Sequence, residues 1–180
     1  MGSRLLLLAG ATILLSAGPM SVSAQDAAGG TRIWGSLVLG EAWNAGTEKT
    51  PGSYGPGVTV ELALARGAHV LAARAGEFAF VDDLREAGLL YARRSAFGGM
   101  QVWAGLGLGY VELEESVVTW KDGGWATVTN KYSAVGIPFV AELSLFPTVP
   151  IGLGVRGFGN VNSVTSYAGI GLVLRIGRVR

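Results

Sequence analysis

The sequence predicts an all-β fold, an eight-stranded antiparallel up-and-down transmembrane β-barrel. Behind the first 24 residues, eight short segments alternate side chains of opposite character, and a period of two places the two sets on opposite faces of a strand. Hydrophobic residues make up 49% of the chain and charged residues only 15%, against roughly 25% charged residues in an average globular protein. No later run reaches the ~18 apolar residues of a membrane-spanning helix, so strands must carry the apolar character.

The N-terminal segment has the features of a secretory signal peptide. Arg4 supplies a positive start, residues 5–15 are apolar, and Val22-Ser23-Ala24 fits a cleavage site between small residues. We therefore expect a signal peptide over residues 1–24, cleaved after Ala24, and a single barrel domain over residues 25–180. An uncleaved N-terminal membrane anchor is the alternative interpretation of the same pattern.

Four strands are expected in the first half of the chain, over residues 31–42, 57–66, 68–78 and 84–94. The first has Ile33, Leu37 and Leu39 in one phase. The second is the clearest, because its even positions from Val58 to Leu64 hold Val or Leu while its odd positions hold Thr, Glu or Ala. The third is weak because alanine occupies both faces. The fourth has Ala, Leu and Tyr in one phase and Glu, Gly, Leu and Ala in the other.

Four more strands are expected over residues 99–110, 131–146, 151–158 and 167–176. The fifth alternates large apolar residues with glycine, and the sixth sets Val135 and Ile137 against Gly136 and Pro138. The seventh alternates Ile, Leu and Val with glycine. The eighth places Ile, Leu and Ala on one face and, opposite to them, a set that includes glycine and Arg175. Segments of about ten residues match the ~9–11 that a tilted transmembrane strand needs.

The predicted connections alternate in length. Short links follow the second, fourth and sixth strands, at residues 67–68, 95–98 and 147–150, whereas residues 43–56 and 112–130 form long links after the first and fifth. Long loops on one side and short turns on the other are typical of outer-membrane barrels.

The second face of the strands indicates what surrounds the barrel. It is mostly Gly and Ala, which is too poor in charge for a water-exposed surface but suits the crowded interior of a small barrel. We therefore expect the Leu, Val and Ile face to contact lipid. The interior face carries a charge network of Glu61, Arg74, Glu86, Glu142, Arg156 and Arg175. We expect these charges to pair as a polar plug without an open pore, with a narrow ion path as the alternative.

The link over residues 112–130 contains the most specific local signal. Asp122-Gly123 is a strong two-residue hairpin turn, and it places Trp120 directly opposite Trp125. The flanking Val and Thr residues favour strands. We expect a stiff hairpin that protrudes from the barrel and offers a site for a protein partner through strand addition, with a flexible loop as the alternative.

Other motifs do not indicate catalysis. Gly152 to Gly157 matches the letters of the dinucleotide fingerprint, but it lies within a strand rather than before a helix. His69 is the only histidine and the chain has no cysteine, so neither a His/Cys metal site nor a disulfide framework is expected. We expect no catalytic residues, no metal and no cofactor. The net charge of +1 does not indicate binding to nucleic acid.

Four aromatic residues fall near predicted strand ends or loops, where either an aromatic girdle or core packing explains them: Trp34, Trp43, Tyr91 and Tyr110.

The signal peptide, the eight strands and the Gly-x-Gly repeat over residues 104–110 resemble the small outer-membrane β-barrel superfamily, such as the OmpA membrane domain, OmpX and the opacity proteins. The chain departs from these barrels in ending with Arg180, where they usually have an aromatic residue. The resemblance implies location in the cell outer membrane, contact with outer-membrane lipid, and a structural or adhesive role through extracellular loops. A barrel enzyme that modifies outer-membrane lipid and a secreted soluble barrel that binds an apolar ligand are the alternatives.

Overall fold

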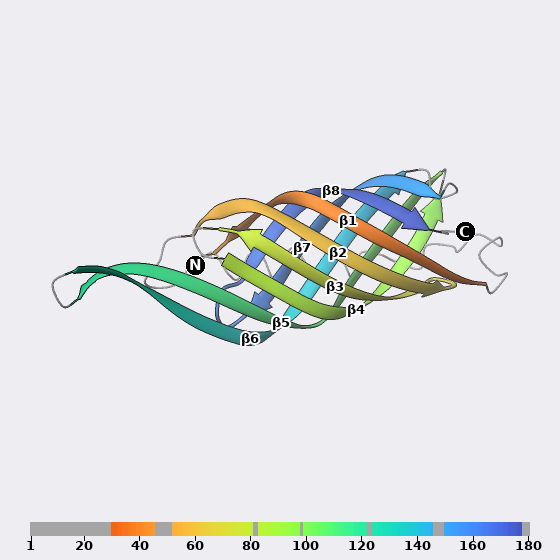
Figure 1. The fold of residues 1–180 in the computed structure, drawn as a ribbon. Coiled ribbons are helices and arrows are strands. Elements are labelled where there is room, and N and C mark those ends of the chain that lie inside the picture. Colours follow the sequence, from red (N-terminus) through yellow and green to blue (C-terminus); the bar gives the residue numbers. More distant parts are fainter. Residues whose placement is uncertain are drawn as a thin grey trace.

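The computed structural model describes residues 30–45, 52–80, 83–97, 99–121, 124–145 and 150–177. They form one antiparallel sheet in which each strand pairs with the next and β1 pairs with β8, so the sheet closes into a barrel (Figure 1). The strands are β1 Thr31–Asn44, β2 Tyr54–Arg66, β3 His69–Ala79, β4 Asp83–Phe97, β5 Met100–Lys121, β6 Gly124–Leu145, β7 Ile151–Asn162 and β8 Tyr167–Gly177. The predicted eight-stranded antiparallel up-and-down barrel is confirmed.

The predicted signal peptide over residues 1–24, with its cleavage site after Ala24, lies outside the described residues. Within the described part of the chain, no helix has the length and apolar character needed to cross a membrane.

The first predicted long loop, residues 43–56, is wrong in its bounds. The β1–β2 ladder continues to the pair Trp43–Tyr54, so the connection begins after Asn44. Pro56 lies within β2, although proline cannot donate a ladder hydrogen bond. The structure accommodates Pro56 where β2 has only β1 as a neighbour, since pairing with β3 begins at Gly57.

The turns at the opposite end are tight. Arg66 pairs with His69 around Gly67, whose φ of 59° lies in the left-handed region that favours glycine. β4 extends to Phe97, which pairs with Met100, so the turn there is shorter than the predicted link over residues 95–98. We call this end of the barrel, which also holds Thr31 and Gly177, the turn end.

The other end of the barrel carries a long protrusion, and we call it the hairpin end. β5 and β6 are each 22 residues long and pair as far as Lys121 and Gly124. β4 pairs with β5 only up to Glu114, and β7 pairs with β6 only from Gly136. The two strands therefore extend beyond the ring as a hairpin (Figure 1).

Side chains divide between the two faces of the wall as the alternation predicts. On β8, Leu172 is 70% exposed on the outside, whereas Gly171, Val173 and Arg175 are buried inside. Two apolar clusters fill the interior. One contains Trp34, Trp103 and Val140, and the other contains Phe78, Phe158 and Tyr167. On β3, Arg74 lies between Ala72 of the first cluster and Phe78 of the second.

Candidate functional site

The larger charged group of the interior is centred on Arg156 of β7. Its Nη1 donates to Glu61 Oε2 at 2.9 Å, and its Nε donates to Glu142 Oε2 at 2.8 Å. Glu142 Oε1 also lies 2.7 Å from Arg175 Nη2 and accepts a hydrogen bond from Ser144. The group holds two carboxylates and two guanidinium groups, so its formal charges cancel.

Two tryptophans pack on the cations of this group. The guanidinium carbon of Arg156 lies 5.0 Å from the ring centroid of Trp103, and that of Arg175 lies 5.1 Å from the Trp34 ring. Both rings are within the distance at which an aromatic face attracts a cation. The sequence was compatible with Trp34 either in an aromatic girdle or in the core. The structure buries Trp34 inside the barrel, whereas Trp43 is 47% exposed.

The smaller charged group joins Arg74 of β3 to Glu86 of β4. The Arg74 guanidinium forms an ion pair with Glu86, and it also donates to the main-chain oxygens of Phe139 and Gly159 at 3.4 and 3.3 Å. Glu86 accepts hydrogen bonds from the Tyr167 hydroxyl and from Asn160 Nδ2, the latter at 2.8 Å. This group is also neutral.

Glycines leave the space that these side chains occupy. Arg74 pairs with Gly88, which pairs with Gly109 on the next strand, so the inward positions beside Arg74 carry no side chain. At Gly136, an added Cβ would lie 2.0 Å from Asn160 Oδ1. Glycine at this position therefore allows Asn160 to reach Glu86.

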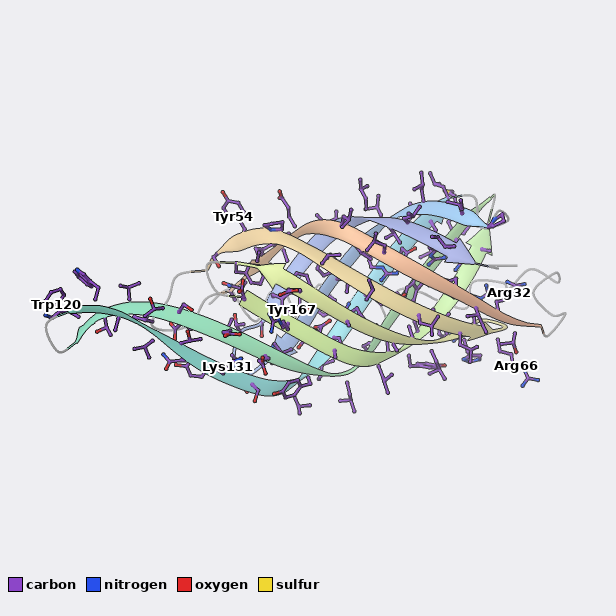
Figure 2. All side chains as sticks on the ribbon, in the orientation of Figure 1. Arg32, Tyr54, Arg66, Trp120, Lys131 and Tyr167 are labelled. Atoms are coloured by element: carbon purple, nitrogen blue, oxygen red, sulfur yellow. The ribbon has the colours of Figure 1, made fainter. Side chains whose placement is uncertain are left out.

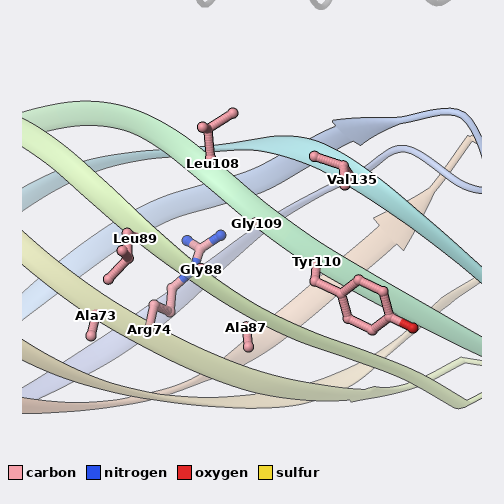
Figure 3. A pocket seen from close by; sticks show the side chains of 9 residues that line it. All are labelled: Ala73, Arg74, Ala87, Gly88, Leu89, Leu108, Gly109, Tyr110 and Val135. Carbon is pink, nitrogen blue, oxygen red and sulfur yellow. The ribbon is translucent and has the colours of Figure 1, made fainter.

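An open depression of about 530 Å³ lies on the outer wall over this part of the barrel. Its lining is mainly apolar and includes Leu108, Tyr110 and Val135, with Gly88 and Gly109 among the lining residues. The guanidinium end of Arg74 lies beside Gly88 in the close view (Figure 3). The depression faces outward, like the exposed leucine and valine around it.

The six charged residues predicted on the interior face are thus all buried, in two separate groups. Five neutral partners of these charges were not predicted from the sequence: Asn160, Tyr167, Ser144, Trp34 and Trp103. Their inward parity was visible in the sequence, but parity alone does not say which residues meet across the barrel. Within the described residues, no cluster of three or more His, Asp or Glu side chains has the arrangement to hold a metal ion.

The protruding hairpin is held by cross-strand pairs. Trp120 pairs with Trp125, and their rings meet edge to face at 5.2 Å between centroids. Nearer the barrel, Lys131 Nζ lies 3.3 Å from Glu114 Oε2. The predicted turn residues Asp122 and Gly123 lie outside the described residues, but the pair Lys121–Gly124 has the register that their turn requires.

The outer edges of the hairpin lack neighbours. Residues 115–121 of β5 have no partner on the β4 side, and residues 124–135 of β6 have none on the β7 side, within the part of the chain that the structure describes. Both tryptophans are exposed, Trp120 by 59% and Trp125 by 74%. Unpaired edges with few charges are sites where another strand can add.

Charged side chains on the outer wall differ between the two ends. At the hairpin end, Arg85 pairs with Glu77 at 3.2 Å, as Lys131 does with Glu114. At the turn end, Arg66, His69 and Arg93 lie side by side on neighbouring strands. Figure 2 shows Trp120 and Arg66 at opposite ends of the molecule.

Comparisons with known proteins find likeness in structure. Neisserial surface protein A has a TM-score of 0.60 at 9% identity, covering 81% of this chain and 96% of that chain. The N-terminal β-barrel domain of Pseudomonas aeruginosa OprF has a TM-score of 0.56 at 13% identity, covering 81% and 96%. Ail, the attachment invasion locus protein of Yersinia pestis, has a TM-score of 0.52 at 9% identity, covering 83% and 97%.

No protein-family model matches the chain, and no curated protein matches its sequence. The three solved structures are small eight-stranded outer-membrane β-barrels, and this chain has their fold. The predicted resemblance is confirmed at the level of the fold.

Proposed function

We propose that the chain is an outer-membrane β-barrel with a plugged interior and a structural or adhesive role, in which the β5–β6 hairpin presents a surface to a partner outside the cell. The observation that carries the proposal is the division of the closed wall, with apolar side chains outside and ion pairs inside. A closed barrel can span a bilayer because every backbone group of its wall finds a partner within the ring.

The outer wall favours lipid over water. Leucines such as Leu62, Leu89 and Leu108 are 62–69% exposed, in the middle of their strands. A large continuous apolar surface of this kind is unfavourable on a soluble monomer. The secreted soluble barrel therefore becomes the weaker alternative.

The interior favours a plug over a channel. Glu61, Glu142 and Arg156 meet across the lumen and are each no more than 5% exposed. Apolar clusters lie toward both ends of the interior. Eight strands enclose only enough space for side chains. We expect no stepwise ion conduction in a planar bilayer.

The hairpin supports the interactive part of the proposal. Its free β6 edge offers unpaired main-chain groups to an extended strand of a partner protein, beside the exposed rings of Trp120 and Trp125. One structural neighbour, Ail, bears a name that refers to attachment, a role of the kind proposed for this barrel.

Location is tested by separating the membranes of expressing cells. The protein is expected in detergent extracts of the outer membrane, with a gel mobility that shifts on heating. Recovery as free periplasmic protein would contradict the proposal and favour the soluble barrel. The alternative of a lipid-modifying enzyme is tested at His69, which lies at the turn end, away from the outer surface proposed here. His69→Gln is expected to leave the composition of the outer-membrane lipid unchanged.

The hairpin is tested by shortening it while its register is kept. Residues 117–128 are removed and Ser116 is joined to Thr129 through Asn-Gly, because these two residues already pair and Asn-Gly favours a two-residue turn. The shortened barrel is expected to insert into the membrane, and its gel mobility is expected to shift on heating as in wild type. Binding of the expressing cells to host cells or to matrix protein is expected to fall to background. The matched control is Trp43→Ala, which removes an exposed aromatic residue of the same end outside the hairpin. Unchanged binding by the shortened protein would rule out the hairpin as the contact.

A further inference from the structure

We propose that Arg66, His69 and Arg93 form a binding site for the phosphate-bearing headgroup of an anionic phospholipid in the periplasmic leaflet. The inference rests on the proposed membrane function, in which the turn end faces the periplasm. It adds a specific lipid contact at that end to the proposed contacts of the hairpin.

The three side chains lie in one row across three strands. Arg66 of β2 pairs with His69 of β3, and His69 pairs with Arg93 of β4. All three are exposed on the outward face of the wall. Directly opposite side chains in an antiparallel ladder have Cβ atoms about 4.5–5.5 Å apart, so His69 has an arginine at this distance on each side. The long arginine side chains can reach a phosphate placed over His69.

No acidic side chain among the described residues forms an ion pair with Arg66, His69 or Arg93. The outer wall at the hairpin end differs, because Arg85 and Lys131 each have a glutamate partner there. Arg66 and Arg93 therefore flank His69 without an acidic ion-pair partner among the described residues. A bound phosphate group would supply the missing negative charge, and arginine is suited to bind phosphate through paired hydrogen bonds.

The neighbouring row of outward-facing residues, two positions further along the same strands, favours a ligand with an apolar part. It contains Leu64, Leu71 and Tyr91, which pair across the same strands and are 45–58% exposed. Tyr91 also links the two rows, since its hydroxyl lies 2.6 Å from His69 Nδ1. A row with two arginines followed immediately by an apolar row matches a lipid, whose phosphate is joined to acyl chains, better than it matches free phosphate.

The height of the row on the wall fits a headgroup position. Along β3, the outward side chains of His69 and Glu77 lie on either side of an apolar stretch. Their separation is roughly 27 Å along the strand, or about 20 Å across the membrane at a tilt near 40°. This distance is close to the apolar band of an outer-membrane barrel, about 25 Å tall. The basic row therefore lies where lipid phosphates are found.

The test uses the full-length mature chain, inserted into vesicles of equal parts phosphatidylglycerol and phosphatidylcholine. The barrel is then released in mild detergent, and the lipids that stay bound are identified by native mass spectrometry. We expect wild type to retain phosphatidylglycerol over phosphatidylcholine by about tenfold, from the attraction of two arginines to an anionic surface. The triple variant R66Q/H69Q/R93Q is expected to lose this preference to within about twofold of none, with the heat-dependent gel shift unchanged.

The matched control is R85Q/K131Q, which removes two cations from the outer wall at the hairpin end and is expected to keep the preference. If the triple variant does not fold, the single variant R93Q replaces it in the test. R93Q is expected to lose about half of the preference on a logarithmic scale.

Inorganic phosphate added to wild type is expected not to displace the lipid. Displacement would instead assign the site to free phosphate and overturn the proposal, as would a preference retained in the triple variant. Insertion without any preference overturns this inference alone, whereas failure to insert overturns the proposed membrane function and this inference with it.

Discussion

β5 and β6 pass through two different environments along one continuous ladder. Inside the ring, Trp103 and Glu142 are fully buried, whereas beyond it Trp120 and Trp125 on the same strands are mostly exposed. The pairing of β5 with β6 is antiparallel in both regions. What differs is the presence of β4 and β7 on either side. Neighbouring strands and a shared interior therefore stabilise the ring section, while the hairpin section depends on cross-strand pairs and is marginal by itself.

The largest effect is expected from Glu142→Gln in the ring section of β6. This change leaves Arg175 without its ion pair and weakens the two hydrogen bonds from Arg156. Loss of one partner from a buried ion pair lowers the free energy of unfolding by about 3–5 kcal/mol. Urea unfolding of the barrel in micelles, followed by tryptophan fluorescence, measures the loss.

The matched control lies on the hairpin section of the same strand. Lys131→Gln breaks an ion pair in which the lysine side chain is 58% exposed, so it is expected to change the same free energy by less than about 1 kcal/mol. Equal losses from the two variants would contradict the contrast between ring and hairpin.

A second effect is expected from Gly107→Ala in the ring section of β5. The added Cβ would lie 1.8 Å from the main-chain oxygen of Leu89, which can move only with β4. Overpacking of this kind lowers the free energy of unfolding by about 1–3 kcal/mol. Gly124→Ala in the hairpin section has nothing within 4 Å of its new methyl group and is expected to leave the unfolding midpoint unchanged.

The smallest effect is expected from Trp125→Ala. It removes the edge-to-face contact with Trp120, and a cross-strand aromatic pair contributes about 0.2–1 kcal/mol. Hydrogen exchange is expected to quicken for the amides of residues 116–129 and to stay the same in the ring. If Trp125→Ala raised the exchange rates of the hairpin amides less than those of the ring amides, the hairpin would have another source of stability.

Strand periodicity was sufficient to predict the ring and the orientation of its charged residues. Glu61, Arg74 and Glu142 were predicted to face inward because each shares the parity of small residues on its own strand, and the structure buries all three. The hairpin register followed from one dipeptide, Asp122-Gly123, whose turn geometry fixes which residues face each other.

The partners of those charges were not predictable, because they depend on the register of the whole ring. Glu61 and Arg156 are 95 residues apart in sequence, and no local pattern relates their heights on the barrel. The start of β2 at Tyr54 was not predicted for a similar reason, since the place of Pro56 within the strand depends on where pairing with β3 begins. The face on which a side chain lies depends on one strand and could be predicted from the sequence. The contacts between side chains depend on several strands together and required the structure.

The seam between β1 and β8 has a consequence for the order in which the barrel is completed. β1 and β8 are the first and last strands of the described chain, so an emerging chain keeps two open edges until its final strand is present. That strand also brings Arg175 to Glu142. A chain that stops before β8 therefore lacks both the closing ladder and a counter-charge in the lumen. Because this cation lies on the closing strand, closure of the ring and neutralisation of its interior depend on the same segment of the chain.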